Sequence, residues 1–230
     1  GTCRASAERL AAAGLPVVVG YASNAAEADA AVATITAAGG SAVAARLDVS
    51  EPADVEAAFE LATGCYGGVD VVVHAAGRLA LSPIVDLDLD ELDALHRTNV
   101  RGTFVVAQAA ARALRPGGAL LTFSTSVIAL ALPDYGAYAA SKGAVEALTM
   151  VLARELRGRD VTVNAVAPGP TATEMFLDGK DPETIELMAM QPPLERLGTA
   201  ADIAELVAFL ASPAGHWVNG QVVRANGGIA

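Results

Sequence analysis

The stretch Val69-Asp70-Val71-Val72-Val73-His74 is a short apolar run between two longer stretches of helical character, 52–65 and 89–99. A run of this length, rich in valine, is typical of a strand that is buried on both faces. Short apolar runs and longer helical stretches alternate in this way along the chain, which indicates βαβ units and a parallel sheet. We therefore predict an α/β fold, a doubly wound parallel sheet with helices on both faces, in a single domain over residues 1–230.

The same alternation places the individual elements. We predict strands at Pro16–Tyr21, Ser41–Leu47, Val69–His74, Ala119–Ser124, Val161–Ala167 and Gln221–Arg224. We predict helices at Arg4–Ala13, Asn24–Ala38, Pro52–Cys65, Leu89–Asn99, Thr103–Leu114, Tyr138–Leu156 and Ala201–Leu210. Ser50 and Thr199 offer capping hydroxyls before two of these helices. The sequence has no internal repeat and no linker long enough to divide it.

Composition fits this fold and excludes several classes of function. Hydrophobic residues make up 53% of the 230 residues and aromatic residues 4%, which suits helices packed closely on a parallel sheet. The net charge of −11 argues against nucleic acid and anionic membrane surfaces as partners. Cys3 and Cys65 are too few for a disulfide framework, and neither has a Cys or His neighbour at metal-ligand spacing. We therefore expect no metal site and a reducing, cytoplasmic setting. We interpret the uncharged run 116–133 as a buried strand plus a loop.

Two segments depart from the regular alternation. The first helix opens directly after Gly1-Thr2-Cys3, whereas a doubly wound sheet has its earliest strand in the middle. A missing central strand would leave backbone groups unpaired in the core. We therefore expect a strand and most of a glycine-rich loop, about 10–20 residues, to precede residue 1. Residues 171–197 form an excursion beyond the sheet, either a mobile lid over a substrate or a variable surface insertion.

Tyr138 and Lys142 are four positions apart, so they lie one turn from each other on the same face of a predicted helix. A free tyrosine has a pKa of about 10, which makes it a poor proton donor or acceptor at neutral pH. A nearby ammonium favours the phenolate and lowers that pKa, as general acid–base catalysis requires. The pair by itself is weak evidence, because the same spacing occurs by chance on solvated helices.

Other residues agree with the pair in order and spacing. The matching motifs are Asp48-Val49, His74-Ala75-Ala76-Gly77, Asn99-Val-Arg-Gly102, Ser126, Tyr138-x-x-x-Lys142, Asn164-x-x-x-Pro168-Gly169 with Thr173, and the tail Asn219-Gly220 with Gly227-Gly228. With these motifs the whole chain resembles the short-chain dehydrogenase/reductase family, in particular its members that resemble 3-oxoacyl-[acyl-carrier-protein] reductase. The resemblance implies a Rossmann-type fold. His74 stands where asparagine is commoner, and we expect a structural role for it.

The resemblance implies a catalytic role for each of four residues. Tyr138 would protonate a carbonyl oxygen as hydride reaches the carbon, or act as the base in the reverse direction. Lys142 would lower the pKa of that tyrosine and bind the nicotinamide ribose. Ser126 would donate a hydrogen bond to the same carbonyl oxygen, and Asn99 would hold a water that relays protons to Lys142. A turn serine and a helix-capping asparagine are the alternatives for the last two residues.

The resemblance also implies the cofactor contacts. Gly1 and Thr2 would receive the pyrophosphate at the start of the first helix, where Cys3 replaces the usual glycine. Further contacts, from the adenine to the nicotinamide, are expected from Asp48, Val49, Ala75, Ala76, Gly77, Tyr138, Lys142, Pro168, Gly169, Thr171 and Thr173. The choice of cofactor rests on the end of the first predicted strand and the residues after it, Tyr21, Ala22, Ser23 and Asn24. An acidic side chain there would accept bonds from the ribose 2′-OH, and its absence favours NADP(H) over NAD(H).

We therefore expect an NADP(H)-dependent oxidoreductase that reduces a ketone to a secondary alcohol, or catalyses the reverse, on a 3-oxoacyl thioester or a similar small carbonyl substrate. A sugar or polyol dehydrogenase, a steroid or polyketide dehydrogenase, and a non-catalytic nucleotide-sensing scaffold are the alternatives. Segment 171–197 contains apolar residues that could contact a hydrophobic substrate or another subunit: Met175, Phe176, Leu177, Met188 and Met190. A homo-oligomer, dimer or tetramer, is implied through the helices at 103–114 and 138–156 and the last strand.

Overall fold

Strands and helices alternate along the chain in the computed structural model, which describes residues 1–230 except for the side chain of Met175. The expected contacts of that side chain therefore lie outside the described residues. The strands are β1 (Val17–Tyr21), β2 (Ala42–Arg46), β3 (Val69–His74), β4 (Leu114–Phe123), β5 (Thr162–Pro168) and β6 (Val222–Ala225). The α-helices are α1 (Thr2–Ala12), α2 (Ala25–Ala37), α3 (Pro52–Tyr66), α4 (Leu89–His96), α5 (Gly102–Ala113), α6 (Val127–Leu130), α7 (Gly136–Glu155), α8 (Glu174–Leu177), α9 (Pro182–Ala189) and α10 (Ala200–Leu210). Shorter turns are η1 (Ile84–Asp86), η2 (Arg97–Arg101) and η3 (Pro213–Gly215).

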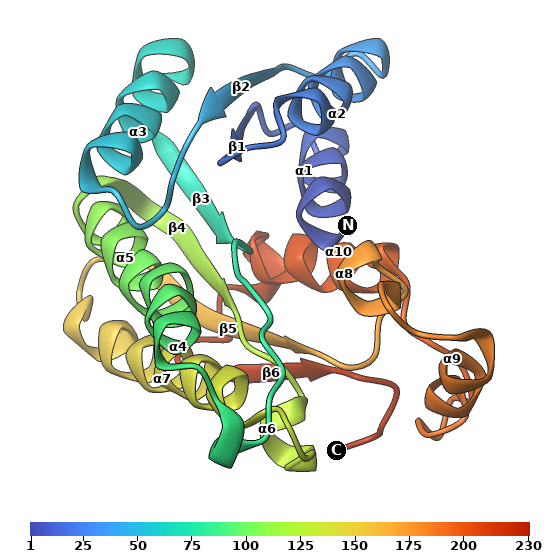
Figure 1. Cartoon of the computed structure of the whole chain (residues 1–230). Coiled ribbons are helices and arrows are strands. Elements are labelled where there is room, and N and C mark those ends of the chain that lie inside the picture. Colours follow the sequence, from blue (N-terminus) through green and yellow to red (C-terminus); the bar gives the residue numbers. More distant parts are fainter.

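The strand pairs are parallel, as the alternation of elements predicts (Figure 1). They form two groups, in the orders β1-β2 and β3-β4-β5-β6. Within the described chain β1 pairs with β2 alone and β3 with β4 alone, so each keeps one edge without a strand partner. The predicted parallel α/β architecture is therefore confirmed, although the sheet is divided into two groups. The expectation that a further strand precedes residue 1 stays a prediction.

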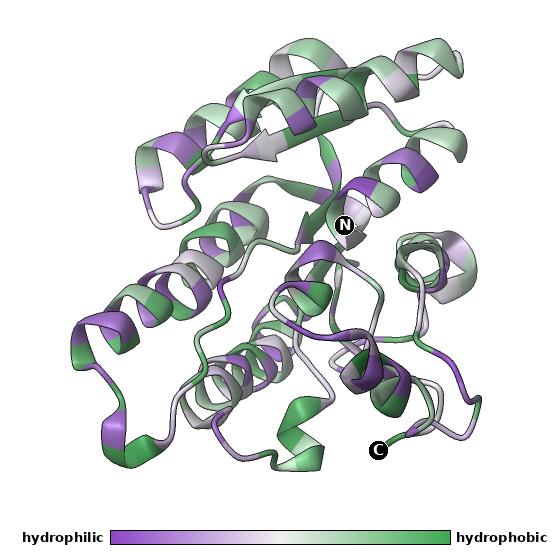
Figure 2. Ribbon diagram, turned by 45° about the vertical axis from the view of Figure 1, so that its right-hand side comes forward, coloured by the Kyte–Doolittle hydropathy of each residue, from purple (hydrophilic) through white to green (hydrophobic). Residues whose placement is uncertain are grey.

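Helices cover both faces of the four-stranded group, and two successive residues of β4 show how. Leu120 is fully buried in an apolar cluster that includes Leu156 at the end of α7 and residues of α5. Leu121 is buried in a second cluster, with Leu10 of α1 and Val207 of α10. Because successive side chains of a strand point to opposite faces, α5 and α7 cover one face while α1 and α10 cover the other. Apolar and polar residues accordingly alternate along the helices in Figure 2.

The predicted helix 89–99 ends earlier than expected. Helix α4 ends at His96, and the π-helical turn η2 leads from it directly into α5. The hydroxyl of Thr103 donates to the backbone oxygen of Asn99 at 2.6 Å. The same type of bond, from a threonine hydroxyl to the backbone oxygen four residues earlier, also occurs within the regular helices α2, α3 and α7, so this bond alone does not cause the wider turn. Asn99 lies inside a π-helical turn and not at the end of a helix.

One of the two predicted caps is formed. The hydroxyl of Thr199 accepts a bond from the backbone N–H of Asp202 at 3.1 Å and completes a capping box at α10. Ser50 does not cap α3, whose N-cap is Glu51. The hydroxyl of Ser50 donates instead to the carboxylate of Asp48 at 2.8 Å, because that charged acceptor lies two residues away. The second predicted cap is therefore wrong.

The uncharged run 116–133 forms most of β4, the loop after it and α6, as the interpretation of a buried strand plus a loop required. Strand β4 begins at Leu114 and not at 119, because the chain passes a register shift against β3 between Val69 and Val71. No helix in the described part of the chain combines the length and the apolar character that a membrane span needs.

Residues 171–197 leave the body of the fold after β5 and carry α8 and α9, which the sequence analysis did not predict. Asp181 caps α9 by accepting a bond from the backbone N–H of Thr184 at 2.9 Å, and Pro182 follows at the first helical position. These two residues are the start signal that was missed. A parallel bridge between Thr171 and Gly198 closes the excursion at its base. In Figure 1, α8 lies near the N-terminus and α9 projects from the body.

Candidate active site

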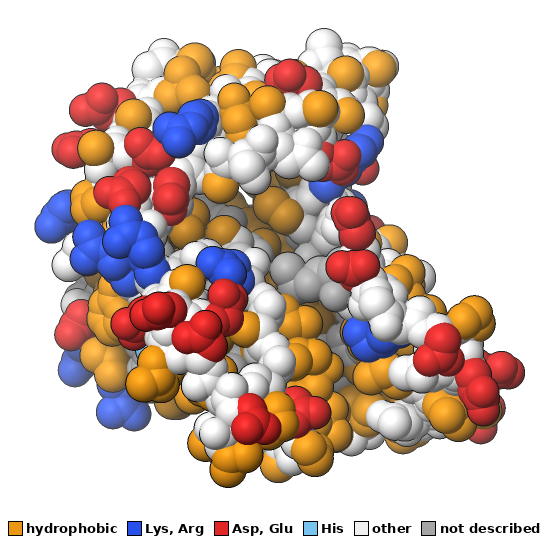
Figure 3. All heavy atoms as spheres, viewed as in Figure 1, with side chains coloured by type: hydrophobic (Ala, Val, Ile, Leu, Met, Phe, Trp, Pro, Cys, Tyr) orange, Lys and Arg blue, Asp and Glu red, His pale blue; other side chains and the backbone are white. Residues whose placement is uncertain are grey.

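The carboxyl ends of β3, β4 and β5 open into a cavity of about 380 Å³. Helix α7 forms one wall, and the start of α1 with parts of the 171–197 segment forms another. The surface is hollowed near the middle of the face shown in Figure 3. Ligands of open parallel α/β sheets bind at this edge, so the cavity is the candidate active site. Eleven of the predicted site residues line it: Gly1, Thr2, Ala75, Gly77, Ser126, Tyr138, Lys142, Pro168, Gly169, Thr171 and Thr173.

Tyr138 and Lys142 lie in the first turns of α7, on the cavity side of the helix. Burial raises the pKa of Tyr138 to about 12, although a hydrogen bond with Thr125 acts in the opposite direction. Burial also lowers the pKa of Lys142 to about 8. Both shifts favour the neutral side chain, because a low-dielectric environment destabilises either charge.

The expected lowering of the Tyr138 pKa is not seen in this structure, in which burial has the larger effect. The ammonium donates to the backbone oxygen of Phe123 at 2.8 Å, and its nitrogen is 6.0 Å from the centre of the Tyr138 ring. Because the ammonium is hydrogen-bonded at the end of β4, burial affects the pKa of the phenol more than the charge of Lys142 does. Tyr138 is therefore held as a protonated phenol across the neutral range.

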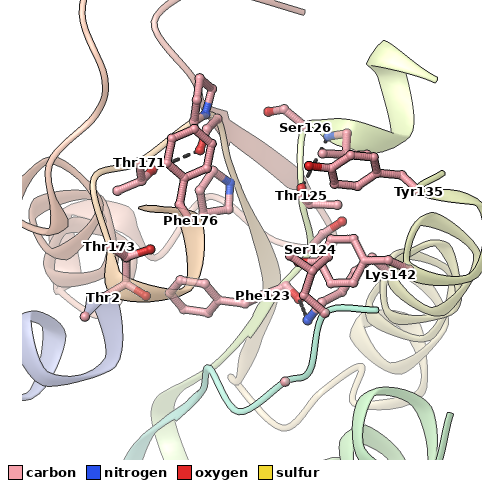
Figure 4. A pocket seen from close by; sticks show the side chains of 18 of the residues that line it. Thr2, Phe123, Ser124, Thr125, Ser126, Tyr135, Lys142, Thr171, Thr173 and Phe176 are labelled. Atoms are coloured by element: carbon pink, nitrogen blue, oxygen red, sulfur yellow. Dashed lines mark hydrogen bonds between the residues drawn. The ribbon is translucent and has the colours of Figure 1, made fainter. Parts of the chain in front are cut away.

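Three hydroxyl residues in succession, Ser124, Thr125 and Ser126, follow β4 on one side of the cavity (Figure 4). The Ser126 hydroxyl is almost fully buried and donates to the backbone oxygen of Ala167 at 3.2 Å. Thr125 contacts the phenol of Tyr138, a role that the sequence analysis missed. The run of three hydroxyl residues at the end of a strand was the signal that could have shown it.

Asn99 is fully buried and is not among the described residues that line the cavity. Its amide nitrogen donates to the backbone oxygen of Arg78 at 2.9 Å, and its side-chain oxygen accepts from the N–H of the same residue at 2.8 Å. A β-carbon on Gly77 would lie 3.2 Å from the Lys142 nitrogen and 3.3 Å from the Asn99 oxygen. Asn99 therefore fixes the loop after β3, and Gly77 leaves room there for Lys142.

Across the cavity, Thr2 lies beside Thr173, and Thr171 and Phe176 complete that wall (Figure 4). Helix α1 starts here without a side-chain cap, so its first N–H groups and the positive end of its dipole face the cavity. Such an arrangement suits an anion. Cys3 in the same turn is an exposed free thiol.

The remaining predicted contacts lie apart from the cavity, after the ends of β1 and β2. The backbone N–H of Leu47 donates to the backbone oxygen of Tyr21 at 2.7 Å, and this bond joins the ends of the two strands. The Asn24 side-chain oxygen caps α2 by accepting the N–H of Glu27 at 3.1 Å. The residues in this group are Tyr21, Ala22, Ser23, Asn24, Asp48 and Val49. Ala76 also is not among the lining residues.

Asp48 is engaged within its own loop. Its carboxylate accepts bonds from the backbone N–H of Ser50 at 2.9 Å and from the hydroxyl of that residue. These two bonds hold the pKa of Asp48 below its ordinary value. The carboxylate therefore stays charged at neutral pH and fixes the turn that carries Val49.

His74 is buried behind the site, with its Nε2 atom 3.0 Å from the hydroxyl of Thr103. That hydroxyl already donates to Asn99, so it accepts from the imidazole, which fixes the Nε2–H tautomer. Burial, with a smaller contribution from the charge of Lys142, lowers the pKa of His74 to about 3. A neutral donor of this kind fits the expected structural role. Among the described residues, no group of three His, Cys, Asp or Glu side chains could hold a metal ion.

Comparison with known proteins places the chain in a family. A family model described as Enoyl-(Acyl carrier protein) reductase matches residues 1–230. The NADPH-dependent aldehyde reductase-like protein, chloroplastic, of Arabidopsis thaliana is 39% identical over 242 residues, covering 99% of this chain and 90% of that protein. A short-chain type dehydrogenase/reductase of Picea abies is 41% identical over 238 residues, covering 99% and 88%. The crystal structure of a short chain dehydrogenase from Burkholderia cenocepacia J2315 in complex with NADP has a TM-score of 0.92 at 37% identity, covering 100% and 93%. The chain belongs to the short-chain dehydrogenase/reductase family.

Proposed function

We propose that this oxidoreductase uses NADP(H) to reduce a ketone to a secondary alcohol, or catalyses the reverse reaction. The observation that carries the proposal is a single cavity lined by Tyr138, Ser126, Lys142 and the first residues of α1. A carbonyl reductase with a dinucleotide cofactor requires a proton donor and an anion-binding helix N-terminus within one site. The Arabidopsis relative is named for NADPH, and the Burkholderia structure holds NADP, which supports the choice of cofactor.

The residues around the cavity fit this cofactor. Gly1 and Thr2 at the start of α1 would hold its pyrophosphate. Gly77 has no side chain to crowd the neighbouring ammonium, and Thr171 and Thr173 would line the nicotinamide end. Tyr21 to Asn24, Asp48 and Val49 would take the adenosine half. When bound, NADP(H) would supply the hydride or accept it.

The proton chemistry falls to this chain's own side chains. Tyr138 holds its proton up to a pKa of about 12 and would transfer it to the substrate oxygen as negative charge develops there. Ser126 would turn its hydroxyl from the Ala167 oxygen to the same substrate oxygen. The ammonium of Lys142 would stabilise the phenolate left behind. Asn99 would act through the loop that it fixes and not by direct contact with the substrate.

The described lining beyond these residues is largely apolar and favours a hydrophobic carbonyl substrate. It includes Leu79, Val127, Leu130, Leu132, Phe176, Met188 and Ile229. A 3-oxoacyl thioester fits such a wall. A sugar or polyol fits it less well, because an apolar lining offers few hydrogen-bond partners to its hydroxyl groups. The 171–197 segment contributes Phe176 and Met188, which supports its proposed use as a lid.

We also propose that the protein forms a homo-oligomer and acts in the cytoplasm. The helices expected to pair expose large apolar side chains, with Phe104 of α5 51% exposed and Val151 of α7 55% exposed. Apolar exposure of this kind is typical of surfaces that another subunit covers. Cys3 and Cys65 are both free in the described chain, which fits a reducing compartment.

Tyr138→Phe removes the proposed proton donor and keeps the ring. We expect kcat for NADPH-dependent ketone reduction to fall by about 10²- to 10⁴-fold, with the Kd of NADPH little changed. Tyr135→Phe is the matched control, because its ring lies 6.5 Å from that of Tyr138 and lines the same cavity. It should keep most of the activity. Undiminished reduction by Tyr138→Phe would leave a non-catalytic nucleotide-binding scaffold as the better explanation.

The pH profile should report Lys142. Its ammonium is lost as pH rises through the pKa of about 8, whereas Tyr138 keeps its proton to about 12. We therefore expect kcat/KM for NADPH, which reflects groups of the free enzyme, to decrease above that lower value. Lys142→Met should give a lower profile without this alkaline limb. A wild-type profile that stays level to about pH 10 would count against the role of the ammonium.

Ser23→Asp places a carboxylate where the ribose 2′-phosphate is proposed to lie. Repulsion should weaken NADPH binding by about tenfold or more, while NADH binding is kept or improved. Ser41→Asp is a control of equal charge, because Ser41 precedes β2 at the opposite end of the same strand group. Fluorescence titration with both cofactors measures the ratio. An unchanged preference would place the 2′-phosphate elsewhere.

Light scattering at micromolar concentration should give two or four times the mass of one chain. Met150→Glu, on the exposed side of α7, should shift the distribution toward the monomer, because a carboxylate is costly to bury in an apolar interface. A wild-type protein that is monomeric under these conditions would contradict the proposed assembly.

A further inference from the structure

The tail of the chain after β6 returns to the catalytic serine. Strand β6 pairs with β5 up to Pro168 and Ala225, and the N–H of Gly169 then donates to the oxygen of Ala225 at 3.0 Å. A β-carbon on Gly169 would lie 2.7 Å from the α-carbon of Asn226. Only a residue without a side chain lets the tail pass this closely. Asn226 is thereby brought to Ser126, a residue 100 positions earlier in the chain.

The Asn226 amide is fixed by three contacts. Its nitrogen donates to the Ser126 hydroxyl oxygen at 3.1 Å and to the backbone oxygen of Ala230 at 2.9 Å. Its oxygen accepts the backbone N–H of Gly228 at 3.0 Å. Rotating the amide by half a turn would place the oxygen against Ala230 and the nitrogen against an N–H donor. The orientation that donates to Ser126 is therefore the one that satisfies all three partners.

The hydroxyl of Ser126 takes part in two hydrogen bonds, one as donor and one as acceptor. A serine hydroxyl has one proton to donate and can accept at its oxygen. The oxygen accepts from Asn226, and the proton goes to the Ala167 oxygen at 3.2 Å. A bond accepted at the oxygen polarises the O–H group and makes it a stronger donor. The bond to Asn226 can persist while the proton turns to a substrate oxygen.

We propose that Asn226 is a positioning residue for the reaction, which orients and polarises the hydroxyl of Ser126 so that this hydroxyl donates to the substrate oxygen. This inference rests on the proposed function, in which Ser126 acts on that oxygen. The tail after β6 therefore belongs to the catalytic apparatus, although no residue of it was assigned a role from the sequence.

A double-mutant cycle tests the proposal in the full chain. Asn226→Ala should lower kcat by about three- to tenfold, the value of one hydrogen bond, with KM for the ketone and Kd of NADPH changed much less. In a Ser126→Ala background the same substitution should have no further effect on the residual kcat. Asn226→Leu, which keeps the side-chain volume, should have the same effect on kcat. It replaces Asn226→Ala in the cycle if the smaller side chain impairs folding.

Asn219→Ala is the matched control. That asparagine also bonds β5, by accepting the N–H of Val163 at 2.9 Å, but it has no contact with Ser126. It should lower the urea midpoint and leave kcat unchanged.

The outcomes distinguish a failure of the positioning role of Asn226 from a failure of the proposed function. If Asn226→Ala costs the same factor with and without the Ser126 hydroxyl, or does not change kcat, the positioning role is overturned while the proposed function stands. If Ser126→Ala alone leaves kcat intact, the assignment of the serine in the proposed function fails, and the role of Asn226 fails with it.

Discussion

Parallel register is the constraint on which the site depends. The pairing of Phe123 with Val166 aligns the ends of β4 and β5, and the pairing of Pro168 with Ala225 aligns β5 with β6. The residues that follow these strands must therefore emerge together at one edge. Ser126 thereby reaches Ala167 and the tail, and the oxygen of Phe123 becomes the acceptor for Lys142. A shift of one residue in the register would turn the side chains of these strands to the other face of the sheet.

Burial sets the electrostatics of the same edge. Tyr138 and Lys142 are both shifted toward their neutral forms by one cause, the cost of a charge in a low-dielectric environment. For a reductase, this pKa keeps the proton in place throughout the neutral range but makes the phenol a weaker acid, so proton transfer would rely on the strong basicity of the alkoxide that forms. In the proposed reaction, the ammonium would stabilise the buried phenolate that is left after proton transfer.

Local patterns predicted the parts of the fold and the site that depend on nearby residues. The strand Val69–His74 was placed without error, and Tyr138 and Lys142 share one helix face, because both features follow from short-range periodicity. The bond between Ser126 and Asn226 could not be predicted, since it joins residues 100 positions apart through the register of three strands. The π-helical turn at Asn99 was also missed, and the side chain of Asn99 there bonds Arg78 and Ser141, which are distant in the sequence.

The contacts of Asn99 differ from those that the resemblance to the family implies. Its side chain is occupied on both sides by the backbone of Arg78 and also donates to Ser141 at 3.0 Å. A fully buried amide that already makes three hydrogen bonds has little capacity left to hold a water that relays protons. What it does control is the position of the loop at Gly77, which sets the space beside Lys142. The space available to the ammonium therefore depends on a residue that is not among those lining the cavity.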